Sequence, residues 1–161
     1  TEAVKTALKS GCISGFVCDC WENEPDIDTE LLDLTAIATP HIAGYSKDGK
    51  ATGTYMSVQA ISHFFNLGLN NWEPSGVELP TQPIIEIDGK DLSEQEIFAR
   101  AILHTYDIRT DDKEFRTNTS LFEQLRGDYP VRREFPAFSI KQKNMRESTV
   151  VKLKQLGFNI I

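Results

Sequence analysis

The sequence predicts an α/β fold, because short apolar runs alternate along the chain with stretches of helical periodicity. Residues 13–21 are apolar at nearly every position from Phe16 onward, which is typical of a strand buried on both faces in a parallel sheet. Residues 36–39 form a second short apolar run, which Pro40 ends. Helices before, between and after two such runs are typical of the last part of an α/β fold.

Helices are expected around these runs. The first covers residues 1–10, and Gly11 stands where a glycine commonly ends a helix. A short helix over residues 29–34 connects the two runs, and a long helix follows over about residues 47–67. The core side of the long helix is expected to carry five residues, Met56, Ala60, Ile61, Phe64 and Phe65.

The chain is expected to contain two units joined by a linker. Residues 69–80 are rich in turn formers and have no hydrophobic period, which is typical of a linker. Charge separates the flanking parts, since residues 1–68 carry nine acidic and four basic residues whereas residues 81–161 carry thirteen of each. Residues 1–68 are therefore predicted to form one unit and residues 81–161 a second, small α+β unit.

The second unit is expected to begin with a strand over residues 83–87. Ser93 and Glu96 have the spacing of a capping box, which predicts a helix from there to about Tyr106. The remaining expected elements are helices that start at Ser120 and Asn144 and strands over residues 135–140 and 158–161. The core candidates of the last helix are Val150, Val151, Leu153 and Leu156. Because a domain of about 80 residues has a marginal core, a second subunit is expected to complete it.

Composition places the chain among ordinary globular proteins, with 40% hydrophobic and 25% charged residues. The net charge of −7 argues against a nucleic-acid partner, since nucleic-acid-binding domains usually have a basic excess. No run of about 20 apolar residues is present, which argues against a membrane span. The three cysteines, Cys12, Cys18 and Cys20, are too few for a disulfide scaffold and lack the spacing of metal ligands. Buried free thiols at Cys18 and Cys20 and a cytoplasmic location are therefore expected.

Three polar residues near the two strand ends could carry chemistry. Asp19 lies in an apolar strand, where a carboxylate must be hydrogen-bonded or paired; it either caps a neighbouring loop or contacts a ligand. Glu24 follows the first strand and His41 the second. If the strands are parallel neighbours, both loops lie at one edge of the sheet and Glu24 can reach the imidazole. A carboxylate beside a histidine suits general acid–base catalysis near neutral pH.

Two segments carry a resemblance to a known family. The run Phe16–Pro25 (FVCDCWENEP) and the run Ala38–Gly44 (ATPHIAG) resemble the signature of the NAD-dependent D-2-hydroxyacid dehydrogenases. Within that family, residues 106–112 and 132–135 are similar to the C-terminal dimerisation domain of a branch that oxidises a phosphorylated four-carbon hydroxy acid. The resemblance places that reaction in pyridoxal 5′-phosphate (vitamin B6) biosynthesis.

The resemblance implies a role for five residues. Asp19 would contact the carboxamide of the nicotinamide, and Gly44 would line the same cofactor pocket. His41 would take the proton of the C2 hydroxyl while hydride leaves C2 for NAD, and Glu24 would orient His41. Tyr45 would contact the substrate. The resemblance implies no metal.

Two parts of the family pattern are absent from the sequence. No glycine-rich Gly-x-Gly-x-x-Gly loop is present, and no arginine precedes Arg100 to serve as the family's substrate-binding arginine. Residues 1–68 are therefore expected to be the C-terminal part of a Rossmann-type NAD-binding domain, followed by the linker and by a dimerisation domain over residues 81–161 that forms a homodimer. The segment alone is expected to be inactive.

Some alternatives remain open at this point. The phosphate of the substrate needs cationic partners, for which Arg109, Arg132 and Arg133 are candidates, although surface or interface ion pairs are the favoured interpretation of these arginines. Another D-2-hydroxyacid dehydrogenase, of the phosphoglycerate type, is a second hypothesis for the activity. A non-catalytic NAD-sensing or assembly protein with the same fold is a third.

Overall fold

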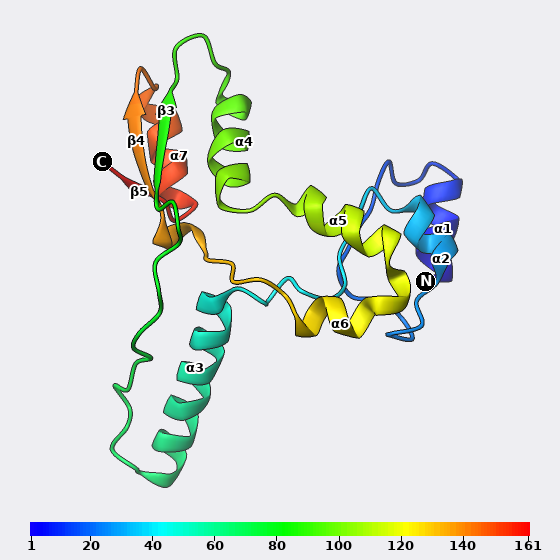
Figure 1. The fold of residues 1–161 in the computed structure, drawn as a ribbon, viewed down its shortest axis with the longest axis horizontal. Helices are drawn as coiled ribbons and strands as arrows, with labels where there is room; N and C mark the ends of the chain where they lie inside the picture. The colour runs from blue at the N-terminus through cyan, green and yellow to red at the C-terminus, as the bar shows by residue number, and fades with distance from the viewer. The chain divides into compact units, whose positions relative to one another are not determined.

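The computed structural model describes residues 1–161, which divide into two compact units (Figure 1). Unit 1 consists of residues 1–44 and 107–130, and unit 2 consists of residues 45–106 and 131–161. Packing therefore joins residues 107–130 to the N-terminal part of the chain, which the linear division at residues 69–80 does not anticipate. The assignment of domains in the whole protein stays a prediction.

Unit 1 contains a pair of parallel strands, β1 (Val17–Cys18) and β2 (Ile37–Ala38). Both strands lie where the sequence predicts them, and they are shorter than predicted. The expectation of burial on both faces is wrong for Val17, whose side chain is 59% exposed, because only one face of this strand pair is covered in the chain. The helices of unit 1 are α1 (Glu2–Lys9), α2 (Thr29–Leu34), α5 (Ile108–Thr117) and α6 (Phe122–Gly127).

The core of unit 1 depends on aromatic residues that are distant in sequence. The ring of Phe115, in α5, is completely buried and meets the rings of Trp21 and Phe122 edge-on, with centroids 5.8 and 5.6 Å away. Apolar residues from β1, α2 and β2 complete the cluster, so α5 supplies the centre of a core that the N-terminal segment surrounds. No pattern in the sequence predicted α5.

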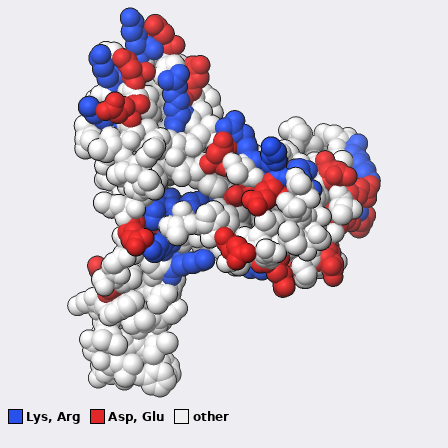
Figure 2. All heavy atoms as spheres, viewed as in Figure 1, with Lys and Arg blue, Asp and Glu red and all other residues white.

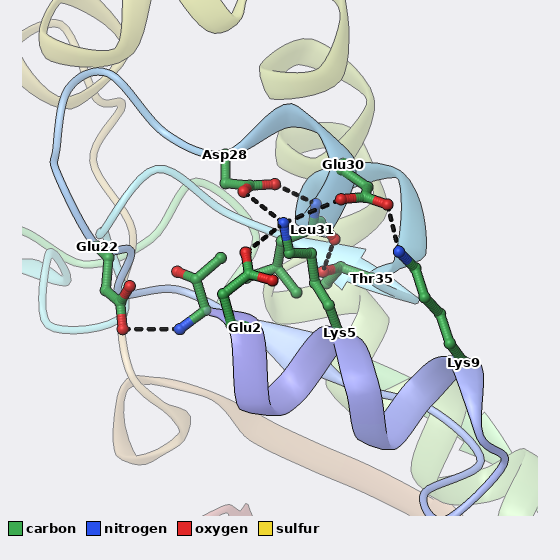
Figure 3. Close-up of polar contacts among 9 residues, drawn as sticks. Glu2, Lys5, Lys9, Glu22, Asp28, Glu30, Leu31 and Thr35 are labelled. Atoms are coloured by element: carbon green, nitrogen blue, oxygen red, sulfur yellow. Dashed lines mark hydrogen bonds and ion pairs between the residues drawn. The ribbon is translucent and has the colours of Figure 1, made fainter.

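A buried lysine joins α1 to α2 (Figure 3). The ammonium group of Lys5 lies 2.8 Å from Asp28, 2.9 Å from Glu30 and 2.6 Å from Glu2, and Lys9 also pairs with Glu30. Asp28 additionally caps α2 by accepting the N–H of Leu31 at 2.7 Å. The hydrogen bond from Lys5 lowers the pKa of Asp28, bonds from Lys9 and Lys5 lower the pKa of Glu30, and the carboxylates raise the pKa of Lys5.

Unit 2 contains a three-stranded sheet in the order β3-β4-β5, formed by β3 (Ile84–Asp88), β4 (Ser139–Lys143) and β5 (Asn159–Ile160). All neighbouring strands are parallel. Two helices pack on this sheet, α4 (Glu94–Thr105) and α7 (Glu147–Gln155). The unit is therefore a parallel α/β arrangement where an α+β unit was expected, because crossovers rather than hairpins join β3 to β4 and β4 to β5.

Of the three helix starts predicted from capping residues in the second half of the chain, one is confirmed and two are wrong. The capping box is confirmed, since Ser93 Oγ accepts the N–H of Glu96 and the Glu96 carboxylate accepts the N–H of Ser93. The start at Ser120 is wrong, because residues 119–121 form a 3-10 turn and α6 follows it without a side-chain cap. The start at Asn144 is wrong as well, because its amide donates to Asp88 and α7 begins after Arg146.

Residues 135–140 were expected to form a strand, but Phe135–Ala137 form a 3-10 turn and β4 begins only at Ser139. Val150 and Leu153 are buried in the core as predicted, whereas Val151 and Leu156 are exposed on the outer side of α7.

The long helix α3 (Lys47–Phe65) belongs to unit 2. Ser46 caps its start by accepting the N–H of Gly49, and Asn66 ends it in the left-handed conformation. The predicted core side of α3 is wrong, since all five residues of that face are exposed and Phe64 is 82% exposed. The reason is that no other element of the chain covers this face. Figure 2 accordingly shows α3 as a largely uncharged surface.

Acidic and basic side chains alternate around the end of unit 2 that carries β3 and β4 (Figure 2). Lys141 lies 3.0 Å from Glu86, and Lys152 lies 2.5 Å from Glu94. The charges are therefore paired rather than gathered into a basic patch. None of the helices has both the length and the apolar character that crossing a membrane requires.

Replacing Leu153 with Ala is expected to lower the free energy of unfolding of unit 2 by about 2–5 kcal/mol, because the leucine is completely buried in the core beneath the sheet. Val151→Ala, on the exposed side of the same helix, is the matched control and should change it by less than about 0.5 kcal/mol. Urea denaturation measures both. Equal effects of the two substitutions would contradict the described packing of α7.

Replacing Lys5 with Met is expected to flatten the acid dependence of the stability of unit 1. A carboxylate whose folded pKa is lowered stabilises the protein above its unfolded pKa, and this stabilisation is lost as pH falls through the folded pKa. The wild type should therefore lose stability more steeply than Lys5→Met between about pH 5 and pH 3. Urea denaturation followed by Trp21 fluorescence, with Trp72 replaced by Phe, measures this.

Lys113→Met, at an exposed position of α5, is the control for the lost charge. Parallel pH curves for wild type and Lys5→Met would show that the cluster around Lys5 contributes nothing to the acid sensitivity.

Candidate active site

The candidate site is formed by the two loops that follow β1 and β2. The N–H of Thr39 donates to the carbonyl of Cys18 at 2.9 Å, which extends the pairing of the strands to the point where both loops begin. Pro40 and Ile42 are buried, whereas the His41 side chain between them is 45% exposed. The loop after β2 thus presents the imidazole outward from a fixed backbone.

The backbone of His41 is in the left-handed region, with φ +55°. For a residue with a side chain this conformation costs on the order of 1 kcal/mol, so neighbouring contacts must hold it. The following two residues supply such contacts through their N–H groups, which both donate to Asp19.

Asp19 connects the two strand ends. Its Oδ1 accepts the N–H of Ile42 and the hydroxyl of Thr39, both at 2.7 Å, and Ala43 donates to Oδ1 at 3.2 Å and to Oδ2 at 3.1 Å. These bonds satisfy a carboxylate that an apolar strand would otherwise leave unpaired. The loop-capping role considered from the sequence is therefore present. Contact of Asp19 with a cofactor stays a prediction.

The predicted proximity of Glu24 and His41 is confirmed. Glu24 Oε2 lies 2.8 Å from His41 Nδ1, and Oε1 accepts the N–H of Trp21 at 2.7 Å. Burial raises the pKa of Glu24, but the hydrogen bonds from His41 and Trp21 outweigh burial, so the net pKa is lowered. Because an ionised carboxylate only accepts hydrogen bonds, Nδ1 carries a proton, and in the neutral form of the ring Nε2 is then the acceptor.

The sequence analysis missed the part that Trp21 plays in this arrangement. The indole Nε1–H donates to the carbonyl of Thr39 at 2.9 Å within the core. Trp21 therefore touches both halves of the site, through its backbone N–H to Glu24 and through its ring to the residue two before His41. The family-like run contains this aromatic position, but its bonds depend on the three-dimensional pairing of the strands.

Gly44 and Tyr45 follow the His41 loop. A Cβ atom at Gly44 would have no neighbour within 4 Å, so nothing in this chain requires a glycine there. Tyr45 begins unit 2, where the ammonium of Lys50 lies 4.2 Å from the centre of its ring. The cofactor role of Gly44 and the substrate role of Tyr45 stay predictions.

The surroundings of the thiols and of the three candidate arginines do not indicate a metal-binding or phosphate-binding site. Cys18 is buried, which raises its thiol pKa to about 11, whereas the expectation of burial is wrong for Cys20, which is exposed beyond the end of β1. Arg109 pairs with Asp107, Arg133 pairs with Asp48, and the guanidinium of Arg132 lies 4.5 Å from the ring centre of Tyr106. No group of three or more potential ligands is close enough to hold a metal ion.

Comparisons with known proteins show similarity to one family model and to several named enzymes. Residues 78–157 match a family model described as a domain of unknown function, DUF3410. The chain is 41% identical to erythronate-4-phosphate dehydrogenase of Porphyromonas gingivalis, over 94% of this chain and 40% of that protein. It is 46% identical to the enzyme of Bacteroides fragilis (87% and 37%) and 37% identical to that of Pseudoalteromonas atlantica (98% and 42%).

The chain thus spans about two fifths of the length of the curated relatives that it matches. The resemblance inferred from the motifs is confirmed, since the named relatives are dehydrogenases of a phosphorylated acid and are similar to nearly the whole chain.

Replacing Asp19 with Ala is expected to lower the free energy of unfolding of unit 1 by about 1–3 kcal/mol, because the buried N–H of Ile42 loses its acceptor. Amide hydrogen exchange at Ile42 and Ala43 should accelerate at the same time. Asp26→Ala, an exposed carboxylate in the same connecting segment, should change neither quantity. Unchanged exchange at Ile42 in Asp19→Ala would contradict the role of Asp19 in holding the loop.

Proposed function

We propose that the chain is the C-terminal part of an NAD-dependent erythronate-4-phosphate dehydrogenase. The reaction is the oxidation of 4-phospho-D-erythronate to (R)-3-hydroxy-2-oxo-4-phosphonooxybutanoate, a step of vitamin B6 biosynthesis. The observation that carries the proposal is the 2.8 Å contact between Glu24 and His41, in a chain that is 34–46% identical to proteins of that name.

His41 is the general base in this proposal. Its Nε2 takes the proton of the C2 hydroxyl as C2 is oxidised to a carbonyl, and the ring becomes an imidazolium. Glu24 stabilises this cation because the lowered pKa keeps its carboxylate ionised beside Nδ1. Glu24 also fixes the orientation of the ring, since its second oxygen is anchored to the N–H of Trp21. The protonated ring returns the proton in the reverse direction.

The residues near the loop fit a nicotinamide. Asp19 Oδ2 accepts one hydrogen bond, from Ala43, so it can accept another from the N–H of a carboxamide. The open space beside Gly44 leaves room for a flat ring at the surface of the loop. When bound, NAD would accept the hydride from C2, so that the products are the oxoacid, NADH and the proton held by His41.

In this proposal, a part of the enzyme outside residues 1–161 would supply the glycine-rich loop for the cofactor phosphates and the arginine that binds the substrate carboxylate. Residues 81–161 would form the homodimer contact. The exposed apolar residues of that segment support this assignment, among them Ile84, Val151, Leu156 and Ile161.

His41→Gln in the full-length protein is expected to lower kcat by about 10²–10⁴-fold, because the general base is lost. Glu24→Gln should lower kcat by a smaller factor, since the base remains but its orientation and charge support are gone. His104→Gln is the matched control, because His104 is exposed in unit 2. Absorbance of NADH formed from NAD and 4-phospho-D-erythronate measures the rates.

Full activity of His41→Gln would refute the acid–base assignment. Faster oxidation of 3-phosphoglycerate than of 4-phospho-D-erythronate by the wild type would favour the phosphoglycerate-type alternative. NAD binding without turnover of either acid would favour the NAD-sensing alternative.

A further inference from the structure

The helix α5 lies within the segment that matches the domain of unknown function, yet it packs in unit 1 against β2. Its Asp112 is more than 70 residues from β2 in sequence, and its Oδ1 accepts the N–H of Ala38 at 2.7 Å. The N–H of Thr39 donates to the carbonyl of Cys18, and because successive N–H groups of a strand point to opposite sides, the N–H of Ala38 is directed away from β1. Asp112 therefore holds the outer edge of β2, three residues before His41.

Arg116 lies one turn after Asp112 in α5. It fixes the start of the segment that joins α2 to β2, whereas Asp112 holds β2 itself. Its Nε donates to Asp112 Oδ1 at 2.9 Å, and its two terminal nitrogens donate to the carbonyls of Leu32 and Thr35, each at 2.7 Å. These carbonyls belong to the end of α2, where a helix leaves acceptors without partners inside the helix. The two side chains of α5 thus fix both the end of α2 and the strand that follows it.

Phe115 lies between these two residues and supports the partner loop. Its buried ring packs against Trp21, which donates its backbone N–H to Glu24 and its indole N–H to Thr39. Contacts from α5 therefore lead to both members of the Glu24–His41 pair. The left-handed backbone of His41 needs such support, because a conformation of this kind persists only where the surroundings determine it.

We propose that Asp112 and Arg116 are positioning residues for the Glu24–His41 pair, and that this is one task of the domain of unknown function in this protein. The inference rests on the proposed function for its activity measurement. It goes beyond that function because it assigns part of the catalytic geometry to residues that touch neither substrate nor cofactor. Their effect reaches the site through the backbone of β2 and through Trp21.

The test compares Asp112→Ala and Arg116→Ala with Lys113→Ala in the full-length protein. Lys113 is exposed on the same helix, so its substitution controls for a change in α5 itself. Each of the two positioning variants is expected to lower kcat about tenfold at an unchanged KM for NAD, because small displacements of catalytic groups are costly. Asp112→Asn keeps an acceptor for Ala38 and should retain most of the activity. Where Asp112→Ala does not fold, Arg116→Ala carries the test.

A second measurement does not depend on activity. In ¹⁵N-labelled protein, the proton on His41 Nδ1 should give a low-field resonance that disappears in Glu24→Gln. This resonance should broaden or disappear in Asp112→Ala and Arg116→Ala and persist in Lys113→Ala. If the wild type shows the resonance but oxidises none of the acids, the proposed function fails while the positioning role is still tested by the resonance.

Two results would overturn the inference. One is an unchanged Nδ1 proton resonance in folded Asp112→Ala and Arg116→Ala. The other is a kcat within twofold of wild type in both variants despite a lower melting temperature, since that combination is the signature of a purely structural contribution.

Discussion

The site depends on the carboxylate of Asp19, which receives hydrogen bonds from the loop after β2. A charged group at the end of an apolar strand is unfavourable unless donors surround it. Here the donors are the hydroxyl of Thr39 and the N–H groups of Ile42 and Ala43, on either side of His41. The cost of the half-buried charge of Asp19 and the cost of the left-handed backbone of His41 are therefore offset by one set of bonds. The parallel pairing of β1 and β2 brings these partners within reach of one another.

The second constraint is the return of the chain to unit 1 through α5 and α6. The strands β1 and β2 are two residues long, and a two-stranded sheet of this size has little stability of its own. Phe115 provides the buried aromatic surface, while Asp112 pairs with a backbone N–H that a longer sheet would have paired with another strand. A side chain thus takes the place of a missing strand at the edge of the sheet.

Sequence reasoning succeeded where the deciding interactions are local or follow from strand pairing. The α2 helix and the capping box at Ser93 depend on residues within four positions of one another. The Glu24–His41 contact was predictable, because both residues follow strands whose parallel arrangement brings their ends together. The catalytic and cofactor-binding roles of these residues cannot be read from the contact alone and remain proposals.

The sequence-based predictions that proved wrong have a common physical cause. A local pattern of residues does not specify which other part of the chain packs against it or bonds to it. The periodicity of α3 predicted a buried face, but nothing in this chain covers Phe64. Ser120 has the spacing of a cap, yet a 3-10 turn uses the same residues. The bonds of Asp112 and Arg116 span 74 to 84 residues, and a short charged helix carries no signal of such partners.

The ionisation of Glu24 and the geometry of the site have one origin. The bonds from Trp21 and His41 that hold its carboxylate in place are also those that lower its pKa. A change that displaces Trp21 would therefore weaken the electrostatic support of the imidazole together with its orientation, although no charge has been removed. Because Trp21 packs on Phe115, the geometry of the Glu24–His41 pair depends on a helix that lies outside both loops of the candidate site. The contacts that hold this pair in place consequently extend into α5, beyond the end of the family-like motifs.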